Sequence, residues 1–188
     1  MITQAVILAG GYGTRLKPFT DNNPKPMYPF EGKPFLEYLI KQVASFGIKD
    51  IVVLLGYLPE KIMDYFGDGS RWGVNIRYSI TPVEYETGLR LKGALKENLL
   101  ASEFLMMYCD NYCPIDYRRL SREYFKNEAL IQFTAYRNLD GYTKNNLIIG
   151  DNGLVEVYDK SRTTEGLQGV DIGYAIVNRK VLDLMPDS

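Results

Sequence analysis

The stretch Leu8-Ala9-Gly10-Gly11-Tyr12-Gly13-Thr14-Arg15-Leu16, followed by Pro24-Lys25-Pro26, decides the fold. Just before it, Ala5-Val6-Ile7-Leu8 is an apolar run rich in β-branched residues, which predicts a buried strand of a parallel sheet. The closely spaced glycines let the backbone turn tightly and bring its N–H groups close to a ligand, an arrangement that suits a phosphate chain. Arg15 and Lys25 add positive charge to the same region.

This glycine-rich loop matches neither of the two common phosphate-binding motifs. A P-loop requires Gly-Lys-Ser/Thr, which the chain lacks, and the dinucleotide fingerprint requires glycine where Leu16 stands. The loop is therefore of a third kind. The alternative to a ligand-binding loop is an ordinary strand-to-loop turn with scattered surface charges.

The segments from Gly10 to Leu16 and from Pro24 to Pro26 resemble the signature of the sugar-1-phosphate nucleotidyltransferases, Gly-Gly-x-Gly-Thr-Arg-Leu followed by Pro-Lys-Pro. The resemblance implies the nucleotide-diphospho-sugar transferase fold, an α/β, Rossmann-like three-layer sandwich with a mixed, mainly parallel sheet. It also implies an enzyme that condenses a nucleoside triphosphate with a sugar-1-phosphate and releases pyrophosphate. The alternative is a non-catalytic regulatory or assembly domain of the same fold that binds a nucleotide sugar.

Length and composition fit an enzyme domain of this family. The chain has 188 residues, 46% hydrophobic and 24% charged, and a net charge of −1, which argues against nucleic acid or an anionic membrane as partner. No run approaches the ~20 apolar residues of a membrane span, and no signal peptide pattern is present, so we expect a cytoplasmic protein. We expect residues 1–188 to form one nucleotidyltransferase domain that lacks the family's carboxyl-terminal segment and its second metal-binding aspartate. A homo-oligomer or a fusion to a further domain is compatible with this expectation.

The absence of histidine narrows the chemistry further. Catalysis by Ser-His-Asp or Cys-His groups is excluded, and Cys109 and Cys113 alone cannot complete a four-ligand zinc site. We interpret both cysteines as buried or idle thiols. Nucleotidyl transfer suits these limits, because the attacking phosphate oxygen is already ionised and needs no general base.

The hydrophobic pattern predicts alternating strands and helices after the first strand. Strands are expected at 51–55, 72–78, 104–108, 129–136 and 170–177, with a hairpin over 147–158. Helices are expected at 34–46, 60–66, 116–127 and 178–185, with another beginning after Glu86.

The resemblance implies a nucleotide site on the glycine-rich loop and on the triplet before the predicted helix. Its expected nucleotide-binding residues are Leu8, Gly10, Gly11, Gly13, Thr14, Glu86, Thr87 and Gly88. Arg15 and Lys25 are the expected catalytic residues, Arg15 on the leaving pyrophosphate and Lys25 on the α-phosphate.

The resemblance defines the nucleobase less well than the phosphate-binding residues, and it favours GTP or UTP. Glu86-Thr87-Gly88 resembles uridylyltransferases of this family, such as those acting on N-acetylmuramate-1-phosphate. The segment 32–40 and the strand at 51–55 are more similar to heptose- and mannose-1-phosphate guanylyltransferases. For Arg90 and Lys92, the sequence allows a solvated helix face or a phosphate contact.

Asp110 stands two residues after the end of the apolar run 104–108, with Cys109 between them. A carboxylate at the carboxyl end of a central parallel strand lies at the crevice where α/β sheets bind ligands. The resemblance implies that Asp110 coordinates Mg²⁺, which prefers hard oxygen ligands. The alternative is a structural aspartate in a strand-end turn.

The resemblance also implies a sugar-phosphate site in the last third of the chain. Asp159 would bind sugar hydroxyl groups, Lys160 the phosphate of the sugar, and Asp171 a further hydroxyl group. Because Arg15, Lys25, Asp110 and Lys160 are all present, the enzyme is favoured over the non-catalytic alternative.

Overall fold

The structure, a computed structural model, describes residues 1–127 and 129–186. The chain divides into two compact units, unit 1 with Met1–Gln132 and Ala175–Ser188, and unit 2 with Phe133–Tyr174. The α-helices are α1 (Phe35–Ser45), α2 (Pro59–Phe66), α3 (Thr87–Lys96) and α4 (Tyr117–Lys126). The strands are β1 (Gln4–Ala9), β2 (Pro29–Phe30), β3 (Lys33–Pro34), β4 (Asp50–Leu55), β5 (Asn75–Ile80), β6 (Glu103–Tyr108), β7 (Ile131–Tyr136), β8 (Leu147–Ile149), β9 (Val155–Tyr158) and β10 (Val170–Asn178).

The central sheet has the strand order β5-β4-β1-β6-β10-β7. β1 pairs in parallel with both β4 and β6, and Leu8 stands opposite Leu54 on one side and Tyr108 on the other. The carboxyl ends of these strands therefore meet at one edge of the sheet. The predicted α/β class with a mainly parallel sheet is confirmed.

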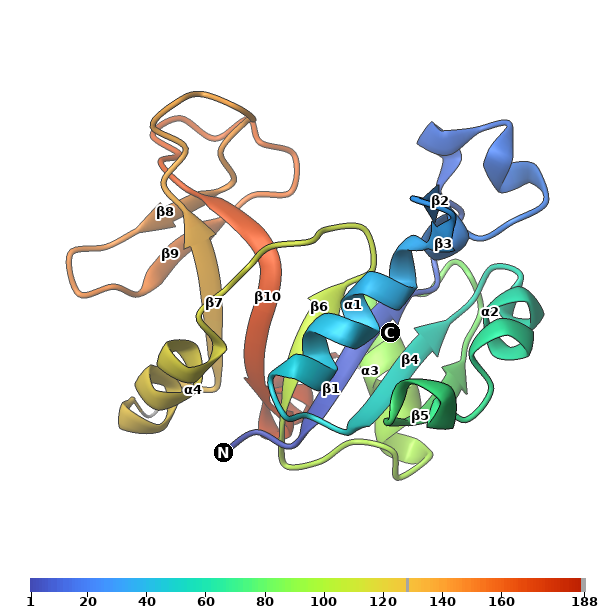
Figure 1. The fold of residues 1–188 in the computed structure, drawn as a ribbon. Helices are drawn as coiled ribbons and strands as arrows, with labels where there is room; N and C mark the ends of the chain where they lie inside the picture. Colours follow the sequence, from blue (N-terminus) through green and yellow to red (C-terminus); the bar gives the residue numbers. More distant parts are fainter. Residues whose placement is uncertain (128, 187–188) are drawn as a thin grey trace. The chain divides into compact units, whose positions relative to one another are not determined.

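Helices cover both faces of the parallel strands in unit 1. In Figure 1, α1 passes in front of the strands, whereas α3 lies behind them. The apolar stripe of α1 is completely buried, as the 3.6-residue period predicts. Its members are Leu36, Leu39, Ile40 and Val43.

Three predicted elements differ from the structure. The strand expected at 72–78 begins only at Asn75, because Ser70–Trp72 forms a 3-10 turn that Gly73 ends with a left-handed φ of 68°. The strand expected at 129–136 begins at Ile131. The helix expected at 178–185 is a 3-10 helix over Arg179–Leu184 rather than an α-helix.

Unit 2 contains the predicted hairpin, in which β8 and β9 are antiparallel. The Asn152 side chain accepts a hydrogen bond from the Leu154 N–H, and Gly153 takes a φ of 78°. These are the contacts that an Asp-Asn-Gly turn predicts. Among the described residues, no helix has both the length and the apolar character that crossing a membrane requires.

Candidate active site

The glycine-rich loop follows β1 at the carboxyl edge of the sheet, and Gly13 is the position where it must be glycine. Gly13 has a φ of 64°, and a Cβ there would lie 2.8 Å from the Cβ of Lys25 and 3.2 Å from Cγ2 of Thr20. Its carbonyl accepts hydrogen bonds from the N–H of Leu16 and the hydroxyl of Thr20. Gly13 thus allows the loop to pack closely against the segment that carries Lys25.

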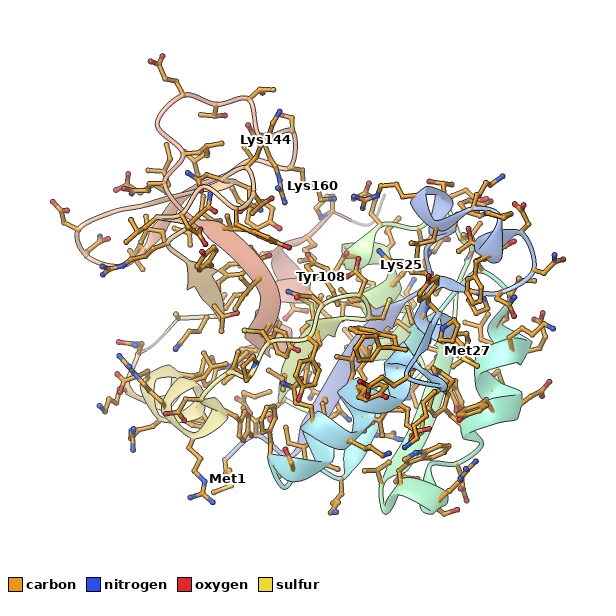
Figure 2. All side chains as sticks on the ribbon, turned by 45° about the horizontal axis from the view of Figure 1, so that its top comes forward. Met1, Lys25, Met27, Tyr108, Lys144 and Lys160 are labelled. Carbon is orange, nitrogen blue, oxygen red and sulfur yellow. The ribbon has the colours of Figure 1, made fainter. Side chains whose placement is uncertain are left out.

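A cleft of about 270 Å³ opens between this loop and the end of β6. Most of the predicted catalytic, nucleotide-binding and metal-binding residues of unit 1 line it, namely Leu8, Gly11, Gly13, Thr14, Arg15, Lys25 and Asp110. Tyr108 and Cys109 also line the cleft, which the sequence analysis did not predict. Their position at the carboxyl end of a predicted parallel strand could have indicated this, because ligands bind at that edge of the sheet. Lys25 and Tyr108 are both labelled in Figure 2.

Lys25 and Asp110 form an ion pair within the cleft, with the Lys25 Nζ donating a hydrogen bond to Oδ2 of Asp110. The two side chains are 25% and 37% exposed. Both groups therefore remain within reach of a ligand. A phosphate can bind the Lys25 ammonium group in place of Asp110, and a cation can bind the Asp110 carboxylate in place of Lys25.

Cys109 lies next to Asp110 but offers no reactive thiol. Burial, together with the neighbouring Asp110 carboxylate, raises the pKa of the Cys109 thiol to about 12. The thiol therefore stays protonated at neutral pH and cannot serve as a nucleophile. Cys109 and Cys113 are both free, and the prediction of buried or idle thiols is confirmed for Cys109, whereas Cys113 is partly exposed.

Both interpretations of Arg90 are wrong. Its side chain neither lies on a solvated face nor lines the cleft: Arg90 is 5% exposed, and its guanidinium group donates to the carbonyls of Gly10, Leu55 and Val83. Burial lowers the pKa of this guanidinium group from its ordinary value. The helical period offered a signal, because Arg90 stands four residues before the buried Ala94 on α3.

Lys92 is half-buried on α3, so the solvated-face interpretation holds only in part, and the phosphate contact stays untested. Its ammonium group donates to the carbonyls of Met185 and Pro186, at 2.6 and 3.0 Å. Lys92 thus ties α3 to the segment after the last 3-10 helix.

The triplet Glu86-Thr87-Gly88 begins α3, with Glu86 as the amino-terminal cap residue. None of the three is among the described residues that line the cleft, and neither is Gly10. The Gly10 carbonyl instead accepts hydrogen bonds from the Tyr57 N–H and from Arg90. The nucleotide-binding role of these four residues stays a prediction.

The three residues predicted to bind the sugar phosphate belong to unit 2. The Asp159 carboxylate accepts hydrogen bonds from the backbone N–H groups of Ser161, Thr163 and Thr164, at 2.7 to 2.9 Å. Together with the hydroxyl groups of the same turn, these donors hold the pKa of Asp159 well below its ordinary range. Asp159 therefore organises its own turn, and the sugar-binding roles of Asp159 and Lys160 stay predictions.

Asp171 lies in a more buried environment on β10. Its carboxylate accepts hydrogen bonds from the Tyr158 hydroxyl at 3.0 Å and from the Gly173 N–H at 2.8 Å. Burial raises the pKa of Asp171 despite these two donors. Its predicted contact with a sugar hydroxyl is likewise untested.

Comparisons with known proteins agree with this arrangement. The chain is 40% identical over 119 residues to the D-glycero-alpha-D-manno-heptose 1-phosphate guanylyltransferase of Campylobacter jejuni, covering 62% of this chain and 52% of the relative. It is 30% identical over 189 residues to the mannose-1-phosphate guanyltransferase of Yarrowia lipolytica, covering 97% of this chain and 51% of the relative. The chain thus spans about half the length of these curated relatives.

The fold is shared with a solved structure as well. The crystal structure of HddC from Yersinia pseudotuberculosis complexed with GMP-PN has a TM-score of 0.78 and 28% sequence identity, over 98% of this chain and 80% of that chain. The predicted nucleotide-diphospho-sugar transferase fold is therefore confirmed. Residues 4–156 match the family described as nucleotidyl transferase. Because this match runs over most of the chain and includes the glycine-rich loop, Lys25 and Asp110, the chain belongs to the nucleotidyl transferase family.

Proposed function

We propose that this chain forms the nucleotide-binding part of a sugar-1-phosphate nucleotidyltransferase, which joins a nucleoside triphosphate to a sugar-1-phosphate. The observation that carries the proposal is the shared cleft of Arg15, Lys25 and Asp110 at the carboxyl ends of β1 and β6. Two cationic side chains beside a glycine-rich loop can bind the phosphates of a nucleoside triphosphate, and the carboxylate can bind the divalent cation that accompanies it.

The donor set in the cleft fits a divalent cation such as Mg²⁺. Among residues 1–127 and 129–186, no cluster of three or more acidic, histidine or cysteine side chains is present that could hold a metal alone. Mg²⁺ commonly keeps several waters and binds through one or two carboxylates together with substrate phosphates. Asp110 supplies one such carboxylate, and a bound cation would neutralise charge on the phosphates during transfer.

The proposed reaction requires no general base. A phosphate oxygen of the sugar-1-phosphate attacks the α-phosphorus of the nucleotide, and the bond between that phosphorus and the oxygen bridging to the β-phosphate breaks. Pyrophosphate leaves with the electron pair of that bond. Lys25 stabilises the charge that builds on the α-phosphate, and Arg15 stabilises the leaving pyrophosphate, as preorganised cations do in phosphoryl transfer.

The relatives favour GTP as the nucleotide and a mannose-type sugar phosphate as its partner. The two curated relatives are named as guanylyltransferases of heptose and mannose 1-phosphates, and the HddC structure contains a guanine nucleotide analogue. UTP remains the alternative, as the Glu86-Thr87-Gly88 triplet suggests.

A thermal-shift series with Mg²⁺ and GTP, UTP, dTTP, CTP or ATP tests the nucleotide site. A nucleotide at about 100 times its Kd stabilises the folded protein by about 2.7 kcal/mol, which raises Tm by several degrees. Pyrophosphate release with GTP and mannose 1-phosphate or D-glycero-alpha-D-manno-heptose 1-phosphate then tests turnover. We expect the largest shift with GTP.

Arg15→Ala should abolish the shift, whereas Arg118→Ala should retain it, because Arg118 is an exposed arginine on α4. Absence of a shift with all five nucleotides would contradict the proposal. A shift without pyrophosphate release in this chain would support the nucleotide site and leave the transfer reaction without support.

A further inference from the structure

A buried arginine connects three segments directly beneath the glycine-rich loop. The Arg90 Nη2 donates to the Gly10 carbonyl at 3.2 Å and to the Val83 carbonyl at 2.8 Å. Its Nη1 donates to the Leu55 carbonyl at 3.0 Å and to the Thr81 hydroxyl at 2.8 Å. One guanidinium group thus links the start of the loop, the end of β4 and the segment 81–86 that leads to the predicted nucleotide-binding triplet.

Two glycines leave the space that this guanidinium group occupies. A Cβ at Gly10 would overlap the Arg90 guanidinium, and a Cβ at Gly56 would lie 2.5 Å from the Gly10 carbonyl oxygen and 2.8 Å from Nη1 of Arg90. Neither glycine has a positive φ, so backbone conformation does not require glycine there. Glycine is needed at both positions for reasons of space. At position 10 a side chain would displace the Arg90 guanidinium, and at position 56 it would also collide with the Gly10 carbonyl.

All four acceptors of Arg90 are neutral. In the part of the chain that the structure describes, no carboxylate lies within ion-pair distance of Arg90. Arginine remains protonated at neutral pH even when it is buried. Its charge therefore has no ion-pair partner there, and the Glu84 carboxylate acts on it only through space. The guanidinium group lies under a loop whose other side lines the cleft.

We propose that Arg90 is a positioning residue, which holds the glycine-rich loop and the segment 81–86 in one fixed arrangement before the nucleotide binds. The inference rests on the proposed function in so far as the ligand is a nucleotide. Only a planar fork of several N–H groups can serve these acceptors together, so lysine cannot replace arginine. A loop that is already ordered binds its ligand without the entropic cost of ordering.

The first experiment measures nucleotide affinity and loop mobility in the same variants. Arg90→Met and Arg90→Lys should each weaken the Kd for GTP with Mg²⁺ by about tenfold, because the loop must then be ordered on binding. Hydrogen exchange in nucleotide-free protein should become faster at residues 10–16 and 81–86. The matched control is Arg77→Met, which removes an arginine that bonds to Asp50 and the Leu99 carbonyl. It should lower Tm yet leave the Kd and the exchange of both segments unchanged.

A second experiment uses the two glycines. Gly10→Ala should weaken nucleotide binding, and adding Arg90→Met to it should cause no further loss, because the inserted methyl group already displaces the guanidinium. In the Gly56→Ala background, Arg90→Met should not restore binding, because the overlap with the Gly10 carbonyl remains.

The outcomes separate this inference from the proposed function. If the wild-type protein binds none of the nucleotides, the proposed function fails, and the exchange rates of residues 10–16 still decide the role of Arg90. Wild-type exchange in a folded Arg90 variant would overturn the inference. So would a wild-type Kd in Arg90→Lys, since that variant keeps the charge and loses the fork.

Discussion

Asp110→Asn separates the two roles that the cleft gives to this carboxylate, as partner of Lys25 and as ligand of a cation. The substitution keeps the shape of the side chain and removes its charge. In the nucleotide-free protein, a phosphate that binds Lys25 must first break the ion pair with Asp110. A pair with side chains 25% and 37% exposed contributes at most about 1 kcal/mol, which corresponds to about fivefold in Kd.

Asp110→Asn should therefore bind GTP about fivefold more tightly than the wild type when Mg²⁺ is removed with EDTA. With Mg²⁺ present, the wild type should gain affinity and the variant should not, because its amide is a poor cation ligand. Isothermal titration calorimetry with and without Mg²⁺ measures both differences.

The matched control is Glu97→Gln, which removes the same charge from an exposed side chain at the end of α3. Glu97 opens the connection to the amino end of β6, whereas Asp110 follows its carboxyl end, so the control should keep wild-type affinities in both conditions. The reasoning is refuted if Asp110→Asn shows the Mg²⁺ dependence of the wild type, or if it binds GTP more weakly than the wild type in EDTA.

Three further predictions concern other parts of the proposed site. In a form of the protein that releases pyrophosphate, Arg15→Ala and Lys25→Ala should each lower turnover at least about a hundredfold, or ~2.7 kcal/mol, and wild-type rates in both would exclude their assigned roles. Because hydrogen bonds hold the pKa of Asp159 well below its ordinary range, they stabilise its turn above the unfolded pKa, and this contribution disappears only as pH falls through the lowered value. The amide shift of Ser161 should stay constant from pH 7 to about 3, and an inflection near the ordinary value of about 3.9 would contradict this. The raised pKa of Asp171 makes the folded state bind its proton more tightly, so stability should fall as pH rises through that pKa. The urea midpoint of Asp171→Asn should therefore fall less between pH 4 and pH 7 than that of the wild type, and equal slopes would disprove this assignment.

The cleft residues of unit 1 could be predicted because each depends on a short local pattern. The apolar run before the glycines predicts a buried parallel strand, and the apolar run before Asp110 predicts another. Parallel strands that are neighbours end at the same edge, so the residues after them meet once β1 and β6 pair. The predicted catalytic pair, Arg15 and Lys25, and the predicted metal ligand Asp110 therefore line one cleft.

Arg90 could not be placed correctly by the same reasoning, because a charged residue on a helix is normally solvated. Its burial depends on backbone carbonyls from positions 10, 55 and 83, which only the folded chain brings within reach of one guanidinium group. Asp159 is a comparable case, because its carboxylate accepts hydrogen bonds from the backbone of the turn that follows it. The pattern of residues along the chain does not show which backbone groups will become hydrogen-bond partners of such a side chain.

The sequence by itself determined the family, the α/β class, the glycine-rich loop and the order of most strands and helices, because these follow from local periodicity and from one contiguous motif. Only the tertiary structure decided that Lys25 pairs with Asp110, that Gly10 and Gly56 leave space for Arg90, and that Asp110 lies beside a thiol with a pKa of about 12. The physical reason is that these properties arise from distances between segments up to about 85 residues apart and from their removal from water, and a linear pattern specifies neither.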